Sequence, residues 1–236
     1  MAELKMGDRF KDYERVSDHY LVRRLPVLCR FDIRAGHTLT RKFDRPYDQG
    51  FANAMKETAI ELLKEIQGAK CAYTQSDEIS ILITDYDNIQ QEPWFGYRVQ
   101  KMASVGASVA SLAFNKALRN YKANPGLAMF DARFFNLPEN DVTNYFVWRQ
   151  KDAERNSLQM LAQANFSHKS LQNLNQSGLQ EKLFTEKGIN YNDIDSYQKR
   201  GIFITKSLSY GDWAPHFDTP IFSQQREVIE ELIPKP

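Results

Sequence analysis

The order of strand-like and helix-like segments over residues 25–135 is the feature that most constrains the fold. Apolar runs bounded by turn residues predict four strands, over 25–33, 70–75, 79–84 and 127–135. Apolar residues at helical spacing predict two helices, over 51–66 and 94–121. The order β-α-β-β-α-β is that of the ferredoxin-like or split βαβ arrangement, an antiparallel four-stranded sheet backed by two helices. We therefore predict an α+β fold.

Helix-breaking residues support these limits. Gly68 follows the first helix, and Asn124, Pro125 and Gly126 follow the second. Before the first strand, apolar residues at helical spacing predict a short amphipathic helix within residues 1–24.

The chain after residue 136 is predicted to be mainly helical. A long helix is expected to begin near Asn140, and a second has Ser177 as its N-cap and Gly188 as its stop. Residues 200–208 have the pattern of a strand. An irregular tail is expected around Pro215, Pro220 and Pro234.

We expect two regions in one compact unit. Residues 1–136 form the sheet domain, and residues 137–236 form a helical extension that packs on it. A chain of 236 residues with 42% hydrophobic residues is long enough to bury one substantial core with such an appendage.

The charge balance excludes a global field that attracts nucleic acid or an anionic membrane. Lys and Arg number 31 against 30 Asp and Glu, a net charge of +1, so any nucleic-acid contact needs a local basic patch. Cys29 and Cys71 lie inside apolar runs, which fits a reducing compartment and offers no zinc-type spacing. No window approaches about 18 consecutive apolar residues. We expect a cytoplasmic protein with no membrane partner.

Two carboxylates are the strongest candidates for chemistry. Asp32 ends the first strand, and Asp77 lies in the hairpin before the third. These strands are central neighbours in the predicted sheet, so the two side chains can approach each other. Carboxylates held close repel unless cations lie between them, and Mg²⁺ prefers a few such oxygens plus substrate phosphates. The pattern indicates phosphoryl or nucleotidyl transfer with two metals about 3.5–4 Å apart.

Each of these features also has an ordinary structural explanation. Asp77 and Glu78 suit a solvated turn, and the co-location of Asp77 with Asp32 is what favours a metal site. The loop after Asp32 is rich in cations that could meet a triphosphate or lie in solvent: Arg34, His37, Arg41, Lys42 and Arg45. Arg98 and Lys101 share one predicted helix face, where surface solvation is the default.

Three spaced motifs resemble the tRNA-histidine guanylyltransferase family. They are QSDEISILI in the hairpin, FDARFF on the fourth strand and YFVWRQKDAERNS on the next helix. The family has Gln-Ser-Asp-Glu, Phe-Asp-Gly-Arg and Trp-Arg-Gln-x-Asp in the same order, after an N-terminal Asp-Gly-Arg. The resemblance runs from about residue 8 to about residue 205. It is specific because several spaced motifs occur in the same order.

The resemblance implies a polymerase-like palm domain that adds nucleotides to the 5′ end of tRNA in the 3′-to-5′ sense. The RNA 5′-monophosphate would first attack the α-phosphate of ATP or GTP. The 3′-hydroxyl of an incoming nucleoside triphosphate would then attack the activated 5′ phosphate. The resemblance also implies two Mg²⁺ ions, tRNA and nucleoside triphosphates as partners, and a homotetramer.

The resemblance assigns roles to individual residues. The implied metal ligands are Asp32, the carbonyl of Ile33 and Asp77. The family usually has glycine at the position of Ile33. Glu78 is implied, with the two aspartates, to be a catalytic residue, one that orders water or a metal. The nucleotide-binding residues are Asp32, Ile33, Arg34, Ala35, Gly36, His37, Ser76 and Asp77. The residues that hold the triphosphate or the RNA 5′ end are Arg45, Asp48, Arg98, Lys101 and Arg133.

The run after Asp152 resembles the bacterial and archaeal guanylyltransferase-like branch. Eukaryotic members have His-Ile-Asn-Asn-Leu-Tyr there, whereas residues 154–159 read ERNSLQ. That branch favours template-directed repair of 5′-truncated tRNA over obligate, untemplated guanylate addition to histidine tRNA, and we expect the repair activity.

Two other functions fit a similar sheet. A nucleotidyl cyclase of the diguanylate cyclase type has an acidic hairpin, but it has Gly-Gly where this chain has Gln75 and Ser76. A non-catalytic RNA-binding module uses exposed aromatics on its central strands. The strands here have Cys71, Tyr73, Phe130 and Phe134 without that module's aromatic-glycine signature.

Overall fold

The computed structural model describes residues 5–123, 126–207 and 211–235. Its centre is one antiparallel sheet in the order β4-β1-β3-β2-β5-β6. The strands are β1 (Val27–Ile33), β2 (Ala69–Gln75), β3 (Glu78–Ile83), β4 (Phe130–Asn136), β5 (Ile202–Lys206) and β6 (Trp213–His216). The first four confirm the predicted β-α-β-β-α-β order, and β5 confirms the strand expected within 200–208, of which residue 208 lies outside the described residues.

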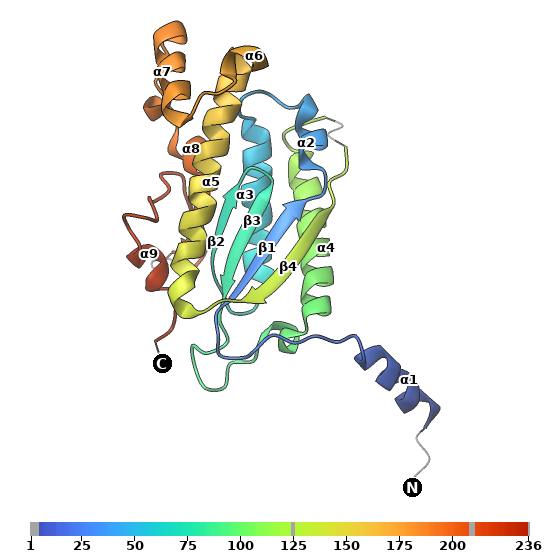
Figure 1. Ribbon diagram of the computed structural model, residues 1–236. Helices are drawn as coiled ribbons and strands as arrows, with labels where there is room; N and C mark the ends of the chain where they lie inside the picture. Colours follow the sequence, from blue (N-terminus) through green and yellow to red (C-terminus); the bar gives the residue numbers. More distant parts are fainter. Residues whose placement is uncertain (1–4, 124–125, 208–210, 236) are drawn as a thin grey trace.

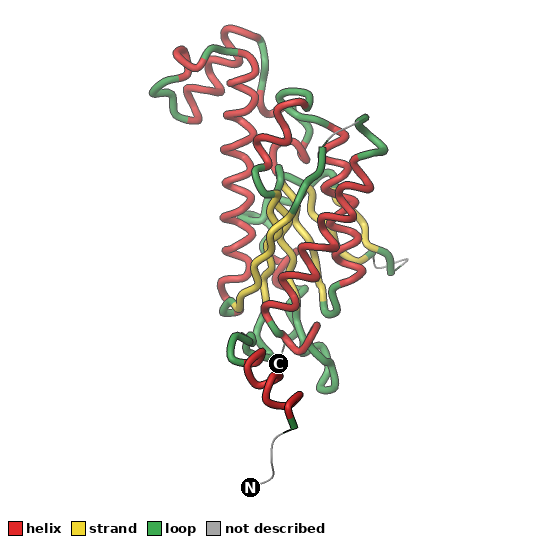
Figure 2. Tube along the Cα trace, turned by 90° about the vertical axis from the view of Figure 1, so that its right-hand side faces the viewer, coloured by secondary structure: helices red, strands yellow, loops and turns green. Residues whose placement is uncertain are grey.

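Two helices cover one face of the sheet and a third covers the other. The pair is α3 (Gln49–Glu65) and α4 (Val99–Leu118), and the third is α5 (Glu139–Asn165), as Figures 1 and 2 show. Gly68 follows α3 with a φ of 82°, where a glycine is favoured because it has no Cβ. The break expected at Asn124 and Pro125 lies outside the described residues.

The smaller helices lie at the ends of this framework. They are α1 (Met6–Arg15), α2 (Gly36–Leu39), α6 (His168–Leu171), α7 (Gln176–Lys187), α8 (Ser196–Arg200) and α9 (Glu227–Glu230), with the 3-10 turns η1 (Thr40–Lys42), η2 (Trp94–Tyr97) and η3 (Tyr191–Asp193). Helix α1 buries none of its residues and projects away from the body (Figure 1).

Alternate residues of the strands build two different cores. On the α3/α4 face, Val27, Cys29, Phe31 and Ile33 of β1 belong to a large apolar cluster. On the α5 face, Leu28 belongs to a smaller cluster that includes Leu82 and Phe146, and Arg30 and Asp32 continue that face toward the end of the strand. The α5 face is therefore apolar at one end of the sheet and charged at the other.

Three predictions about local structure were wrong. The tail contains β6, an edge strand that includes Pro215, a residue that sheets tolerate at their edges. Helix α7 begins two residues earlier than Ser177 suggested, because the Asn175 side chain caps it by accepting a hydrogen bond from the Gly178 amide. Arg98 is not within a helix but is the N-cap of α4, since η2 interrupts the predicted helix.

Candidate functional site

The two predicted metal-binding aspartates lie at the same end of the sheet. In β1, Asp32 is paired with Glu78 of β3 on one side and with Asp131 of β4 on the other. The turn between β2 and β3 consists of Ser76 and Asp77, and the Asp77 carbonyl accepts a hydrogen bond from the Ile33 amide at 3.1 Å. The register of the sheet thus brings carboxylates from three strands and one turn to this end.

The burial of Asp32 and the carboxylates around it change its pKa. Its pKa is raised to about 6: burial is the largest cause, the charges of Asp77, Glu78 and Asp131 also raise it, and Arg30 lowers it. An excess of carboxylates around one half-buried aspartate is a site that a divalent cation would stabilise.

A close contact fixes the loop beside Asp77. A Cβ on Gly36 would lie 1.9 Å from Oδ2 of Asp77, so only glycine fits at that position. Ala35, the residue before it, has a φ of 55°, which is unusual for a residue with a side chain. The loop from Arg34 to His37 is therefore shaped to pass directly under the Asp77 carboxylate.

Glu78 does not face open solvent. It is 6% exposed, and its two carboxylate oxygens accept hydrogen bonds from Nε and Nη2 of Arg149 at 2.8 and 2.7 Å. Arg149 also pairs with Asp152 at 3.4 Å, and Nε of Arg30 lies 3.8 Å from Glu78. Although burial lowers the pKa of Arg149, the Glu78 carboxylate raises it above its ordinary value. The structure thus gives Glu78 a buried, bidentate partner.

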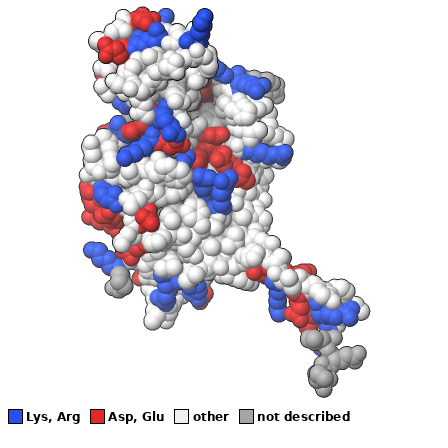
Figure 3. All heavy atoms as spheres, in the orientation of Figure 1, with Lys and Arg blue, Asp and Glu red and all other residues white. Residues whose placement is uncertain are grey.

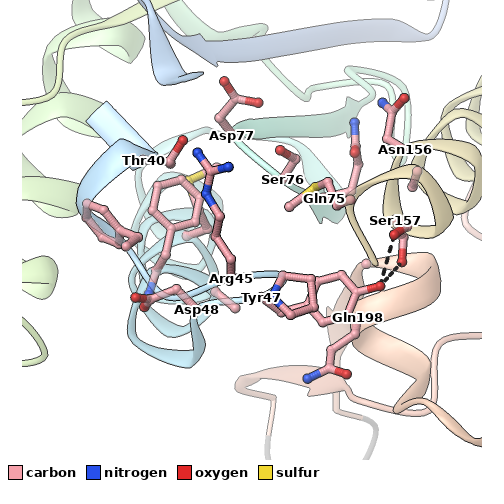
Figure 4. Close-up of a pocket in the computed structure, with 18 of the residues that line it drawn as sticks. Thr40, Arg45, Tyr47, Asp48, Gln75, Ser76, Asp77, Asn156, Ser157 and Gln198 are labelled. Carbon is pink, nitrogen blue, oxygen red and sulfur yellow. Dashed lines mark hydrogen bonds between the residues drawn. The ribbon is translucent and has the colours of Figure 1, made fainter. Parts of the chain in front are cut away.

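A cavity of about 430 Å³ lies beside the turn (Figure 4). Its walls come from the loop after β1, the start of α3, the β2–β3 turn, α5 and α8. Of the predicted nucleotide-binding residues it is lined by Gly36, His37, Ser76 and Asp77. Asp32, Ile33, Arg34 and Ala35 adjoin that lining but are not part of it.

A tyrosine joins the two walls of the cavity. The hydroxyl of Tyr47 donates to the Ser157 carbonyl at 3.0 Å and lies 2.8 Å from the Ser157 hydroxyl (Figure 4). Burial raises the pKa of Tyr47 above its ordinary value. This contact ties the loop before α3 to α5 within the lining of the cavity.

The structure distributes the five predicted triphosphate or RNA residues over three places. Arg45 and Asp48 line the cavity, and Figure 4 shows Arg45 extending toward Asp77. Arg133 is on the same sheet face as Asp32, two residues along β4 from Asp131, with which it pairs at 3.3 Å. Arg98 and Lys101 lie at the opposite end of the sheet, because residues 19–21 just before β1 hydrogen-bond to residues 97–99.

Asp48 has a structural role in the cavity wall. Its carboxylate caps α3 by accepting from the Phe51 amide at 2.8 Å, and it pairs with Lys122 at 3.0 Å. Burial raises the pKa of Asp48, but the hydrogen bonds from the Phe51 and Asp44 amides and from Lys122 outweigh it, and the net pKa is lowered. Asp48 is thus an ionised cap rather than a free acid.

The donor set for a metal is small. Within residues 5–123, 126–207 and 211–235, no three His, Cys, Asp or Glu side chains gather closely enough to hold a metal ion by themselves. The two aspartates nevertheless supply hard carboxylate oxygens in a region of excess negative charge, which fits Mg²⁺ that completes its shell with water and substrate phosphates.

Several residues of the site were not predicted from the sequence. These are Arg30, Tyr47, Ser80, Tyr145, Arg149, Asn156, Ser157 and Gln198. Arg149 was within the recognised WRQKD motif, and a buried carboxylate in the hairpin that needs a cation was the available signal. The Tyr47–Ser157 contact joins residues 110 positions apart, and no local pattern marks it.

Charge is concentrated on the face that carries the aspartates. Figure 3 shows acidic side chains grouped over the end of β1 and the start of β4, with basic side chains on both sides of them. In the described part of the chain, no helix is both long and apolar enough to cross a membrane.

Comparison with known proteins finds matches in one family. The family model described as tRNAHis guanylyltransferase matches residues 7–138. A bacterial tRNA(His) guanylyltransferase (Thg1)-like protein in complex with ATP is 47% identical, with a TM-score of 0.93 over 97% of this chain and 99% of that one. Another such structure, in complex with GTP, is 41% identical, with a TM-score of 0.84 over the same shares. A probable tRNA(His) guanylyltransferase of Homo sapiens is 28% identical, over 88% of this chain and 73% of its own.

Proposed function

The chain belongs to the tRNAHis guanylyltransferase family and is a nucleotidyltransferase, and from that premise we propose that it adds nucleotides to the 5′ end of tRNA. The direction is 3′-to-5′, and the natural reaction is template-directed repair of a 5′-truncated end. The ERNSLQ run after Asp152 and the high identity to bacterial guanylyltransferase-like proteins support this choice over obligate guanylate addition.

The reaction has two nucleotidyl transfers. In the first, an oxygen of the RNA 5′-monophosphate attacks the α-phosphorus of ATP or GTP, and pyrophosphate leaves. In the second, the 3′-hydroxyl of the incoming nucleoside triphosphate loses its proton and attacks the 5′ phosphate of the activated RNA. The activating nucleotide leaves as its monophosphate, and the RNA is one nucleotide longer with a 5′-triphosphate.

Asp32, Asp77 and the Ile33 carbonyl would hold two Mg²⁺ ions. When bound, these ions supply Lewis-acid stabilisation of the attacking and leaving oxygens. The raised pKa of Asp32 among Asp77, Glu78 and Asp131 is the observation that supports the cation site.

The cavity is proposed to bind the activating nucleotide. Its volume of about 430 Å³ is in the range of small-molecule sites, and the similar bacterial proteins bind ATP and GTP. The Ser76–Asp77 turn brings the nucleotide's phosphates to the aspartates, and the Arg45 guanidinium is the cation in the cavity wall that can meet them.

Glu78 is proposed to act through the protein rather than on substrate. Its carboxylate is engaged by Arg149 and lies directly across from Asp32 in the sheet. It therefore fixes the hairpin that carries Asp77 and adds negative charge next to Asp32.

One observation carries the proposal: the end of β1, which carries Asp32, is hydrogen-bonded through Ile33 to the turn that carries Asp77, and Asp77 lines a nucleotide-sized cavity. The test uses a 5′-monophosphorylated tRNA that lacks its first nucleotide, with ATP, four nucleoside triphosphates and Mg²⁺. We expect one added nucleotide, complementary to the base on the opposite strand. Changing that base should change the nucleotide added, whereas constant addition of guanylate would contradict templated repair.

The matched variants are Asp32→Asn, Asp77→Asn and, as the control, Asp141→Asn on the exposed start of α5. The first two should reduce addition by about 10²–10³-fold, the range for loss of one preorganised electrostatic group at a reacting phosphate. The control should retain wild-type activity. Full activity in either of the first two variants, or no extension of any tRNA by the wild type, would refute the proposal.

The same premise supports a homotetramer. The amphipathic helix α1 leaves Phe10 and Tyr13 exposed, and its C-cap residue Val16 is exposed too, which is consistent with an interface between copies. Light scattering should give about four times the 27.4 kDa of one chain. A monomer mass at micromolar concentration would contradict this part of the proposal.

A further inference from the structure

Trp148 is an aromatic side chain that the site described above does not use. It lies on α5 one residue before Arg149, and it is 54% exposed, whereas Trp94 is 4% exposed. An indole exposed to this extent contributes little to the core of the protein. Its surroundings therefore have to explain its position.

The indole is held in place on two sides. Tyr145 contacts it edge-on with ring centroids 5.9 Å apart, and the Arg149 guanidinium lies over the ring at 4.5 Å from its centroid. Arg149 is itself fixed by two hydrogen bonds to Glu78. A ring held this way loses little conformational entropy when a second ring stacks on its open side.

A chain of contacts connects the indole to the strand that carries Asp32. The hydroxyl of Tyr145 lies 2.9 Å from the hydroxyl of Ser80, and Ser80 is paired with Arg30 across β3 and β1. Arg30 is two residues before Asp32 on the same sheet face. Trp148 is not among the residues that line the cavity, so it lies outside the cavity, on the exposed surface of α5.

Basic side chains are exposed on β4 and further along α5. Arg133 of β4 pairs across the sheet with Arg30 of β1, and Arg155 lies two turns further along α5 than Trp148. Arg133 and Arg155 are both about half exposed. Figure 3 shows basic side chains on either side of the acidic group on this face. An exposed aromatic with flanking arginines and no enclosing cavity is complementary to a nucleic-acid end, whose phosphates meet the cations while a base meets the ring.

We propose that Trp148 stacks on the nucleobase at the 5′ end of the RNA substrate. The proposal rests on the proposed function, because it assigns the position of the RNA that the two aspartates act on. Stacking binds the terminal nucleotide, and the Glu78–Arg149 pair connects the indole to the hairpin that carries Asp77. The activating nucleotide, bound in the cavity, makes no contact with Trp148.

The kinetic test compares Trp148→Ala with Trp148→Phe on the 5′-truncated, 5′-monophosphorylated tRNA. Base–aromatic stacking is worth about 1–3 kcal/mol, so Trp148→Ala should raise the KM for tRNA about tenfold. The KM for ATP and the kcat at saturating tRNA should change less than about twofold, since uniform binding is what is lost. Trp148→Phe should restore most of the affinity. Leu112→Ala, at a 74% exposed position of α4 on the far side of the sheet, is the control.

A binding test separates this proposal from the proposed function. A 5′-monophosphorylated RNA hairpin should quench part of the wild-type tryptophan fluorescence, and that part should be absent in Trp148→Phe. The quench requires no turnover, so it is expected even from a wild-type protein that extends no tRNA. If the wild type extends tRNA and Trp148→Ala has an unchanged KM for tRNA, the stacking site is refuted and the function stands. The stacking site would also be refuted if Trp148→Ala raised the KM for ATP as much as the KM for tRNA. A changed oligomeric mass of Trp148→Ala would refute it as well, because Trp148 would then lie between copies of the chain.

Discussion

The two faces of the central sheet are made by alternate residues of the same strands but have different roles. On the α3/α4 face, Phe31 and its neighbours form an apolar layer. On the α5 face, Arg30 and Asp32 lie beside Glu78, and Glu78 pairs with Arg149. The first face holds the strands together by burial, whereas the second orders charged groups at a cost in desolvation. The comparison shows that one register can supply both stability and chemistry.

The largest effect on stability should come from breaking the buried ion pair. Arg149→Met leaves Glu78 buried without its partner and should lower the free energy of unfolding by about 3–5 kcal/mol. The double variant Arg149→Met with Glu78→Gln should recover part of that loss, because the uncompensated charge is removed. Urea denaturation followed by circular dichroism measures both.

The matched change on the apolar face is Phe31→Ala. It should cost a similar amount, about 3–5 kcal/mol, by leaving a cavity under Gly106 and Phe134. Its loss cannot be recovered by removing a charge. The comparison would fail if Glu78→Gln restored no stability to Arg149→Met, or if it restored as much stability to Phe31→Ala as to Arg149→Met.

A glycine substitution should separate activity from stability within the charged region. Gly36→Ala places a Cβ against Oδ2 of Asp77, so the turn or the loop must move. A displacement of about 1 Å near reacting groups can cost about 100-fold in rate. We expect the rate of nucleotide addition to fall by that amount while the protein remains folded. Gly188→Ala in the C-cap of α7, which meets no neighbouring atom, is the control and should retain the rate.

The pH dependence of stability should also differ between the faces. The folded pKa of Asp32, about 6, is above its unfolded value, so ionisation of Asp32 disfavours the folded state. The contribution of Asp32 to stability should therefore decline as the pH rises from about 4 to about 6 in the absence of divalent ions. Asp32→Asn should remove this decline and exceed the wild type in stability at pH 7, and Mg²⁺ should narrow that difference.

The corresponding control is again on the apolar face. The destabilisation caused by Phe31→Ala should be the same at pH 4.5 and pH 7, since Phe31 has no titratable group. Thermal unfolding at several pH values in a chelating buffer provides both measurements. A wild-type stability that rises through the pH 4–6 window while Asp32→Asn stays flat would contradict the assigned direction.

The smallest expected effect on stability comes from a substitution in the cavity wall. Tyr47→Phe removes the hydrogen bonds to Ser157 and should cost about 0.5–1.5 kcal/mol of stability. Because the contact joins the two walls of the proposed nucleotide site, the KM for ATP should rise a few-fold with kcat preserved. Ser157→Ala should have a weaker effect, since the Ser157 carbonyl remains as an acceptor.

The sequence predicted the part of the fold in which structure follows from local pattern. The four strands and the helices between them were read from apolar periodicity, and Asp32 and Asp77 followed from the strand order. The loop glycine at position 36 was noted only through the family resemblance; its reason is the approach of Asp77, which a sequence does not display.

The contacts that escaped prediction join distant segments. Glu78 and Arg149 are 71 positions apart, and Tyr47 and Ser157 are 110 apart. Edge strand β6 depends on pairing with β5 rather than on its own propensity, since it contains Pro215. Arg98 and Lys101 shared a predicted helix face, but no local pattern showed that η2 would begin α4 at the far end of the sheet.

The pairing of Asp32 with Glu78 and Asp131 also acts as a check on folding. If β1 slipped by one residue against its neighbours, every side chain would exchange faces. Asp32 and Arg30 would then enter the apolar layer under α3 and α4, and Phe31 would lie in the charged region. A chain whose charged end of the sheet is misassembled is therefore also a chain without a core, so defective copies should be removed as unfolded protein rather than persist in an inactive form.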